Sequence, residues 1–194
     1  MLKIGITGGI GSGKSTVCAM LEESGIPMFY SDQEAHALFA EDDIKKRVID
    51  LFGERAYQND VLDRKWVGGI VFNDPEKLEA LNAIMRPAVK SRFEAWVLRQ
   101  SANAVGMESA ILIESEGHVD MDFIIVVTAP IEVRIERAMK RDGATKEQIE
   151  SRIAAQMNDE ERAAYADAII DNSGSLHDVR IHVDAIIRSL NLGA

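Results

Sequence analysis

The sequence predicts an α/β fold in which a parallel sheet is flanked by helices. Short apolar runs typical of buried strands alternate with stretches of helical periodicity. The segments between the runs are long enough for the helical crossovers that parallel strands require. A block at about residues 33–106 has helical patterns and no convincing strand. We interpret it as a helical insertion over the carboxyl edge of the sheet, where ligands bind in such folds.

The first elements have clear boundary signals. Residues 2–6 form a short apolar run that ends in glycines, and residues 14–24 have the spacing of a helix. Gly25 and Pro27 are expected to end that helix, because glycine adopts the left-handed conformation after a helix and proline does not continue one. A second strand is expected at residues 27–30.

The insertion is expected to consist of helices. Asp63 and Asp74 are suitable N-cap residues, and Pro75 fits the first helical position. Pro87 is expected to separate two helices, because an interior proline removes a helical hydrogen bond. The expected helices cover residues 33–40, residues 42–52, the stretch from Asp63 to residue 72, the stretch from Asp74 to Pro87, and residues 89–100.

The alternation of strands and helices returns after the insertion. Thr145 and Gln148 have the spacing of a capping box, and Ser175 is a suitable N-cap. Strands are expected at residues 110–113, 123–128 and 168–170, and helices at residues 131–141, from Thr145 onward, and from Ser175 to about residue 190.

Composition and charge exclude several classes of protein. The chain has 194 residues, and its 22 basic and 32 acidic side chains give a formal charge of −10. This acidity argues against a dedicated nucleic-acid-binding protein, which needs a basic field. Cys18 is the single cysteine, no apolar run reaches the length of a membrane span, and the N-terminus does not resemble a signal peptide. We expect a cytoplasmic protein without a membrane or nucleic-acid partner, either a monomer or a small homo-oligomer.

Residues 8–15 match the phosphate-binding pattern G-x-x-x-x-G-K-[ST] between a strand and a helix. Glycines let backbone N–H groups wrap around phosphate, and the following helix presents its positive dipole end. Lys14 is expected near the β and γ phosphates, and the Ser15 hydroxyl is expected to bind Mg²⁺. The motif therefore predicts a P-loop NTPase-type sheet. The expected ATP-binding residues of the loop are Gly9, Gly11, Ser12, Gly13, Lys14, Ser15 and Thr16.

Other features favour a kinase among P-loop proteins. The chain has no N-K-x-D motif for reading guanine, and Asp50 to Gly53 matches D-x-x-G only at the end of an expected helix. Motor and transporter ATPases are usually larger chains or parts of assemblies. A small chain with a helical insertion and an arginine-rich helix is more typical of a kinase for a small molecule.

Two carboxylates follow expected strands at the carboxyl edge of the sheet. Asp32 follows the second strand, where it is a candidate to accept the proton of an acceptor hydroxyl or to bind a Mg²⁺ water. The alternative is an N-cap for the next helix. Glu114 ends the strand expected at residues 110–113, where it is a candidate for Mg²⁺ or acceptor contact. A plain surface carboxylate is an equal alternative.

Three arginines share one face of the helix expected at residues 131–141. Arg134, Arg137 and Arg141 are three and four positions apart, and Arg141 precedes a break at Asp142-Gly143. A hinged lid that brings cations to the transferring phosphates has this form, and a solvated helix face is the alternative. Asn172, in a turn after the last strand, is a candidate to read adenine, with ordinary turn chemistry as its alternative.

The ordered set of motifs resembles the dephospho-coenzyme A kinase family over nearly the whole chain. The matching segments are residues 6–15, Leu62 to Lys65, residues 70–72, Leu81 to Ile84, Arg137 with Met139, Arg141 to Gly143, Arg152 to Met157, and Asp171 to Gly174. The resemblance implies a P-loop kinase core, a helical acceptor domain and a lid. We therefore expect a core at residues 1–32 and 107–194, an acceptor subdomain at about 33–106, and a lid at about 138–158.

The resemblance also implies a reaction and its residues. The expected reaction transfers the ATP γ-phosphoryl to the ribose 3′-hydroxyl of dephospho-coenzyme A, with Mg²⁺. Asp32 matches the acidic residue proposed as general base, and Arg137 and Arg141 match the lid-region arginines. The candidate catalytic residues are Asp32, Lys14, Arg137 and Arg141. Arg141 and Asn172 join the loop as ATP-binding candidates, and the acceptor-binding candidates are Asp32, His36, Arg64, Arg86 and Glu114.

The chain departs from the family pattern at positions on the acceptor side. Tyr30-Ser31-Asp32 stands where Asp-Ala-Asp is common, and Arg86-Pro87 stands where His-Pro is expected. The usual proline and final aromatic residue are also replaced in residues 110–114. Two alternatives therefore accompany the main interpretation. One is a P-loop kinase for another small-molecule or nucleotide acceptor, and the other is a nucleotide-binding protein that has lost catalysis.

Overall fold

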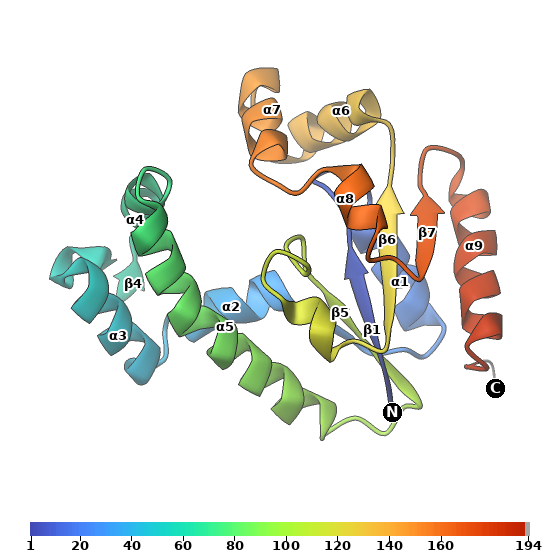
Figure 1. Ribbon diagram of the computed structural model, residues 1–194, viewed down its shortest axis with the longest axis horizontal. Helices are drawn as coiled ribbons and strands as arrows, with labels where there is room; N and C mark the ends of the chain where they lie inside the picture. The colour runs from blue at the N-terminus through green and yellow to red at the C-terminus, as the bar shows by residue number, and fades with distance from the viewer. Residues whose placement is uncertain (193–194) are drawn as a thin grey trace. The chain divides into compact units, whose positions relative to one another are not determined.

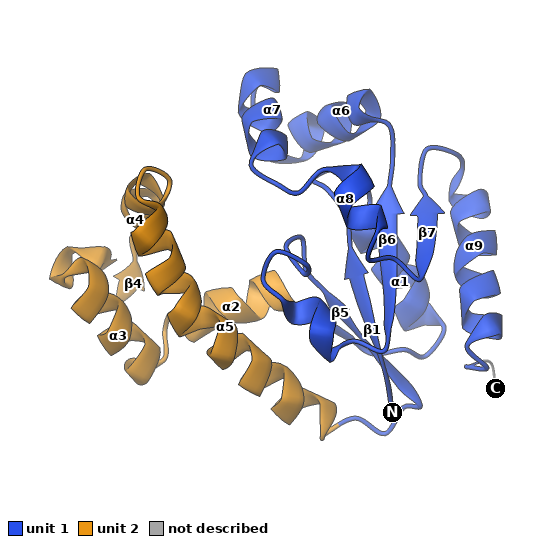
Figure 2. Cartoon of the chain, in the orientation of Figure 1, with its two compact units in different colours: residues 1–30, 100–194 blue, residues 31–99 orange. Residues whose placement is uncertain are grey.

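The computed structural model describes residues 1–192, which form two compact units (Figures 1 and 2). The sheet unit contains residues 1–30 and the described residues from 100 onward, and the helical unit contains residues 31–99. Within the described residues, no helix combines the length and apolar content needed to cross a membrane.

The sheet unit is built on five parallel strands in the order β2-β5-β1-β6-β7 (Figure 1). β1 lies at the centre, and the phosphate-binding motif begins directly after it, so the motif opens at the carboxyl edge of the sheet. The strands are β1 (Leu2–Thr7), β2 (Met28–Tyr30), β5 (Ala104–Glu108), β6 (Phe123–Thr128) and β7 (Ala168–Asp171).

Helices cover both faces of this sheet. α1 and α9 contact each other and pack against one face of the sheet. The main hydrophobic core lies there and includes Ile4, Ile6 and Val183. Three capping boxes begin α7, α8 and α9, and those at Thr145 and Ser175 confirm expected helix starts. The helices are α1 (Lys14–Glu23), α6 (Ile131–Asp142), α7 (Lys146–Ala154), α8 (Asp159–Ala163) and α9 (Leu176–Ser189), with a 3₁₀ turn, η2, at Gly117–Asp120.

The strand expected at residues 110–113 is wrong. The strand is β5, which ends at Glu108, and the apolar residues after it lie in a turn. Leu112 is apolar because it covers the other sheet face, where a Cβ on Gly5 would lie 2.6 Å from its Cδ2. An apolar run covering a sheet cannot be distinguished from a buried strand by pattern alone.

The helical unit contains the expected helices and one short hairpin. Asn59 and Asp60 both have positive φ angles, as a two-residue type I′ turn requires, and join the hairpin strands. The expectation of no strand in this region is wrong for this hairpin. The elements are α2 (Ser31–Leu38), α3 (Asp42–Phe52), a 3₁₀ turn η1 (Glu54–Ala56), β3 (Tyr57–Gln58), β4 (Val61–Leu62), α4 (Arg64–Val71) and α5 (Pro75–Val97).

The helix break expected at Pro87 is also wrong. α5 is continuous from Pro75 to Val97 with Pro87 inside it. An interior proline costs roughly 3 kcal/mol. Packing offsets this cost, because α5 contacts α2, α3 and α4 and buries Ile84 before the proline and Phe93 after it. Asp63 and Asp74 cap α4 and α5 as expected, each accepting a backbone N–H.

Candidate active site

The phosphate loop packs so closely that side chains do not fit at its glycines. Gly11 has φ +77°, and a Cβ there would overlap the carbonyl of Arg134. Gly13 has φ +95°, and a Cβ there would overlap the amide of Asn172. Glycine is therefore required at both positions for backbone conformation and for space.

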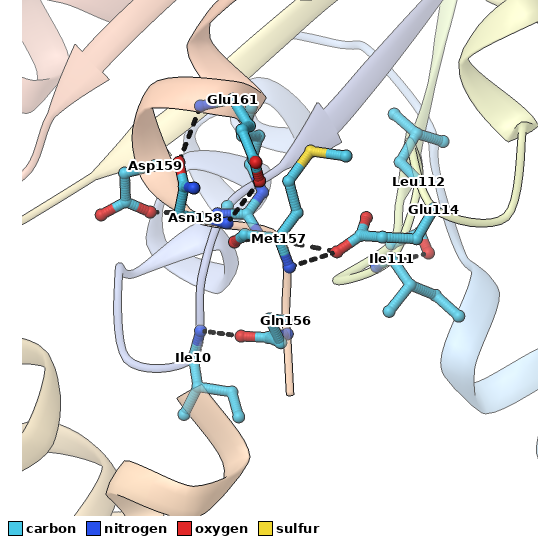
Figure 3. Close-up of polar contacts among 12 residues, drawn as sticks. Ile10, Ile111, Leu112, Glu114, Gln156, Met157, Asn158, Asp159 and Glu161 are labelled. Atoms are coloured by element: carbon cyan, nitrogen blue, oxygen red, sulfur yellow. Dashed lines mark hydrogen bonds and ion pairs between the residues drawn. The ribbon is translucent and has the colours of Figure 1, made fainter. Parts of the chain in front are cut away.

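Contacts from distant segments fix the loop's conformation. The Ile10 N–H donates to Gln156 Oε1 over 3.0 Å, and Arg134 Nε donates to the Ile10 carbonyl over 3.0 Å (Figure 3 shows Gln156 beside Ile10). Asn172 Nδ2 donates to the Ser12 carbonyl over 2.8 Å. The loop therefore has a defined shape that α6, the segment after α7 and the turn after β7 together determine.

Lys14 begins α1 and lies over the loop. Its Nζ donates to the Gly8 carbonyl over 3.0 Å and lies 3.8 Å from Glu108 Oε1. The start of a helix presents backbone N–H groups and the positive end of the helix dipole, and Ser15 is exposed in the first turn of α1. An ammonium, helix N–H groups and an exposed hydroxyl thus meet at one edge of the sheet, which suits a phosphate chain with its metal ion.

The three arginines of α6 have different environments. Arg134 is buried, with 4% of its surface exposed, and binds the loop backbone. Arg137 Nη2 donates to the Asn172 carbonyl over 3.0 Å, while its buried Nη1 has no hydrogen-bond partner among the described residues. Arg141 is exposed and forms an ion pair with Asp142. The expected common face therefore separates into one supporting arginine, one beside the loop and one at the helix end.

Asn172 is 4% exposed, and its amide nitrogen supports the loop. Its contact with adenine stays a prediction. Cys18 is fully buried in α1, and burial raises the pKa of its thiol, so it is a packing residue and not a nucleophile.

Glu114 lies in the turn segment after β5 and not at a strand end. Its Oε1 accepts the Met157 N–H over 3.1 Å (Figure 3). The same oxygen lies 3.6 Å from Arg162 Nη2. The alternative of a plain surface carboxylate is wrong, because its Oε2 is buried. The structure therefore brings Glu114 to the segment between α7 and α8.

The remaining candidates belong to the helical unit. Asp32 and His36 are exposed and lie one turn apart on α2, so they share a helix face. Asp32 lies in the first turn of α2, which begins at Ser31, and the N-cap alternative is therefore wrong. Arg64 is the first residue of α4, and Arg86 forms an ion pair with Glu79 at 3.2 Å on α5.

Comparison with known proteins identifies the family. The family model described as Dephospho-CoA kinase matches residues 2–178. The chain belongs to the dephospho-CoA kinase family. A dephospho-CoA kinase from Bacteroides fragilis strain YCH46 is 43% identical over 175 residues, which cover 89% of this chain and 85% of the relative. The kinase from Salinibacter ruber is 38% identical and covers 93% of both chains.

Solved structures agree with this assignment. The structure of TT1252 from Thermus thermophilus superimposes with a TM-score of 0.88 at 35% identity and covers 97% of both chains. Dephospho-CoA kinase from Campylobacter jejuni superimposes with a TM-score of 0.70 at 26% identity, covering 97% of this chain and 96% of that one. A shikimate kinase from Acinetobacter baumannii, with a TM-score of 0.59 at 15% identity, shares the fold. The expected P-loop kinase fold is confirmed.

Sequence reasoning missed two residues of this member of the dephospho-CoA kinase family, Glu108 and Arg162. Glu108 ends the strand beside β1 and faces Lys14, and a correct placement of β5 would have identified it. Arg162 is fully buried and binds Asp159. No local signal marks Arg162, because a basic residue three positions after an acidic one on a helix is usually exposed.

Proposed function

We propose that this chain transfers the γ-phosphoryl group of ATP to the ribose 3′-hydroxyl of dephospho-coenzyme A, giving coenzyme A and ADP. The observation that supports this most directly is Lys14 over a glycine loop at the start of α1, in a chain of the dephospho-CoA kinase family. Phosphoryl transfer depends mainly on positioning and on stabilising charge, and this arrangement supplies both.

The phosphate loop binds ATP through Gly9, Gly11, Ser12, Gly13, Lys14, Ser15 and Thr16. Backbone N–H groups and the α1 dipole attract the phosphates. Lys14 exchanges its contact with the Gly8 carbonyl for the β and γ phosphates, because a charge-assisted hydrogen bond to phosphate is stronger than one to a neutral carbonyl. Glu108, at 3.8 Å, orients the ammonium beforehand.

Mg²⁺ binds with the nucleotide. Among the described residues, no cluster of three or more His, Cys, Asp or Glu side chains could hold a metal by itself. Ser15 and Glu108 would hold the ion together with phosphate oxygens, because Mg²⁺ prefers oxygen donors. When bound, Mg²⁺ neutralises charge on the phosphates.

Acid–base chemistry and acceptor binding use the helical unit. Asp32 accepts the proton of the acceptor hydroxyl, for which an exposed carboxylate two residues after β2 is suited. His36, Arg64 and Arg86 contact the acceptor, whose phosphates attract basic groups. Arg137 and Arg141 stabilise the transferring phosphoryl group, and the buried Nη1 of Arg137 supports this role because it needs an acceptor. The cytoplasmic location and the oligomeric state stay predictions.

The test is an assay of the purified protein with Mg²⁺, ATP and dephospho-coenzyme A, in which mass spectrometry identifies the product. Formation of coenzyme A with one ADP per turnover supports the proposal. ADP formation only with a different acceptor in a screen favours a kinase of other specificity. ATP binding without turnover of any acceptor favours a nucleotide-binding protein that has lost catalysis. Either of those two outcomes rejects the proposed activity.

A further inference from the structure

We propose that Arg162 is a positioning residue for the phosphate loop and acts through Asp159 and Arg134. The inference deepens the proposed function and rests on ATP binding at this loop. Arg162 lies in α8, within a segment that we call the return segment, residues 156–162, where the chain comes back from the expected lid. Nothing in its local sequence assigns it a part in nucleotide binding.

A chain of charge-assisted contacts leads from Arg162 to the loop. Arg162 Nη1 donates to Asp159 Oδ1 over 3.0 Å, and Arg134 Nη1 donates to Asp159 Oδ2 over 2.6 Å. Arg134 Nε then donates to the Ile10 carbonyl. Asp159 thus uses one oxygen for each of two buried arginines. Loss of the carboxylate would take the shared charge partner from two buried guanidinium groups, so the chain of contacts is expected to be stiff.

The other side of Arg162 fixes the backbone of the return segment. Arg162 Nη2 donates to the Met157 carbonyl over 2.7 Å, and the Met157 N–H donates to Glu114 Oε1 over 3.1 Å. Figure 3 shows the Met157 backbone directed at the Glu114 carboxylate. The guanidinium fork therefore joins a side chain and a backbone carbonyl at once, which an ammonium cannot do in the same geometry.

The two sides meet at Ile10, in the middle of the phosphate loop. Its N–H is bound by Gln156 of the return segment, and its carbonyl is bound by Arg134, which Asp159 of the same segment holds. The N–H lies in the peptide group before Ile10 and the carbonyl in the peptide group after it, so the two contacts fix the orientation of two adjacent peptide groups. The return segment therefore sets the direction of the neighbouring loop N–H groups, and ATP affinity depends on that direction.

The primary test compares Arg162→Lys with Arg188→Lys, which makes the same change at an exposed position of α9. Calorimetry measures the Kd of Mg-ATP without acceptor, and kinetics measures the KM of dephospho-coenzyme A. Arg162→Lys is expected to weaken ATP binding about tenfold, equivalent to about 1.4 kcal/mol, with an unchanged acceptor KM. Arg188→Lys is expected to leave both the Kd of Mg-ATP and the KM of dephospho-coenzyme A as they are in the unchanged protein.

A second pair decides the outcome if Arg162→Lys does not fold. Asp159→Asn removes the charge that both arginines share and replaces one of its two acceptor oxygens with a donor. Glu160→Gln makes the same charge change at the exposed neighbour. We expect Asp159→Asn to weaken ATP binding about tenfold and Glu160→Gln to leave ATP binding unchanged. An ATP Kd within threefold of the unchanged protein, or an equal rise in the acceptor KM, overturns the inference. Calorimetry with ATP needs no turnover, so absence of coenzyme A formation rejects the proposed function without deciding this one.

Discussion

Asn172 Nδ2 donates a hydrogen bond to the Ser12 carbonyl over 2.8 Å, although 160 positions separate the two residues. Asn172 follows β7, the edge strand next to β6, and its own carbonyl accepts from Arg137. The residue after β7 thereby supports the phosphate loop that follows β1. A loop that binds phosphate with its backbone needs such external support, because its glycines give it freedom to adopt other conformations.

Asn172→Asp should therefore weaken both the fold and ATP binding. The substitution places a carboxylate oxygen against the Ser12 carbonyl where a donor stood, which leaves a buried acceptor unsatisfied. We expect a loss of about 1–3 kcal/mol in the free energy of unfolding, measured by urea denaturation, and weaker ATP binding by calorimetry. Asn103→Asp is the control, because Asn103 is exposed. Equal effects of the two variants would contradict a specific role for this bond.

Gly11→Ala is expected to abolish measurable ATP binding. The new Cβ would overlap the Arg134 carbonyl, so the loop must change its path. Gly25→Ala is a matched control, because Gly25 also has a positive φ, +83°, but its Cβ would meet no atom within 4 Å. The control should lose about 1–2 kcal/mol of stability from backbone strain and keep its ATP affinity. A Gly11→Ala protein with normal affinity would show that the loop relaxes easily.

Pro87→Ala should stabilise the protein. Pro87 is exposed inside α5, and alanine restores the missing backbone donor without removing a buried contact. We expect the free energy of unfolding to rise by roughly 1–3 kcal/mol. Ser91→Ala, at an exposed position of the same helix, should change it by less than about 0.5 kcal/mol. No gain for Pro87→Ala in denaturant titrations would mean that the helix has adapted its geometry to proline.

The ion pair of Asp142 should make a small contribution to stability that depends on pH. The hydrogen bond and charge of Arg141, with the charge of Arg152, lower the pKa of Asp142 below its ordinary value of 3.8. A lowered pKa in the folded state stabilises the fold above pH 3.8, and this contribution is lost as the pH falls through the folded value. Asp142→Asn should therefore cost at most about 1 kcal/mol at pH 6.

The comparison of thermal unfolding between the unchanged protein and Asp142→Asn checks this expectation across pH 3 to 6. The difference in melting temperature should begin to shrink as the pH falls below about 4, where Asp142 of the unfolded chain takes up a proton, and should vanish below the lowered pKa of Asp142 in the folded state. A difference that stays constant over this range would mean that Asp142 acts through packing or backbone contacts and not through charge.

Local chemistry decided most of the boundaries that were predicted correctly. The Thr145 capping box, the Asp63 and Asp74 caps and the glycine loop all act between residues a few positions apart. The physical cause is therefore visible in the order of the residues. The same holds for the family, because its motifs keep their order and spacing along the chain.

The errors concern features that depend on packing. Leu112 is apolar because it covers the sheet beside Gly5. The sequence pattern had predicted that Leu112 belongs to a strand of the sheet. α5 continues through Pro87 because buried residues on both sides outweigh the lost hydrogen bond. In both cases one sequence pattern fits two local structures: a strand or a covering turn at Leu112, and a broken or a continuous helix at Pro87. Only the surrounding elements decide which of the two forms.

By itself, the sequence determined that a phosphate loop with Lys14 follows the first strand, because that motif is contiguous. Tertiary structure alone decided what supports the loop. Asn172, Arg134 and Gln156 come from three distant segments, and their contacts with Ser12 and Ile10 exist only once the chain is folded. The burial of Arg162 and its pairing with Asp159 were found only in the folded structure, because a charge becomes buried when packing brings its partner to it.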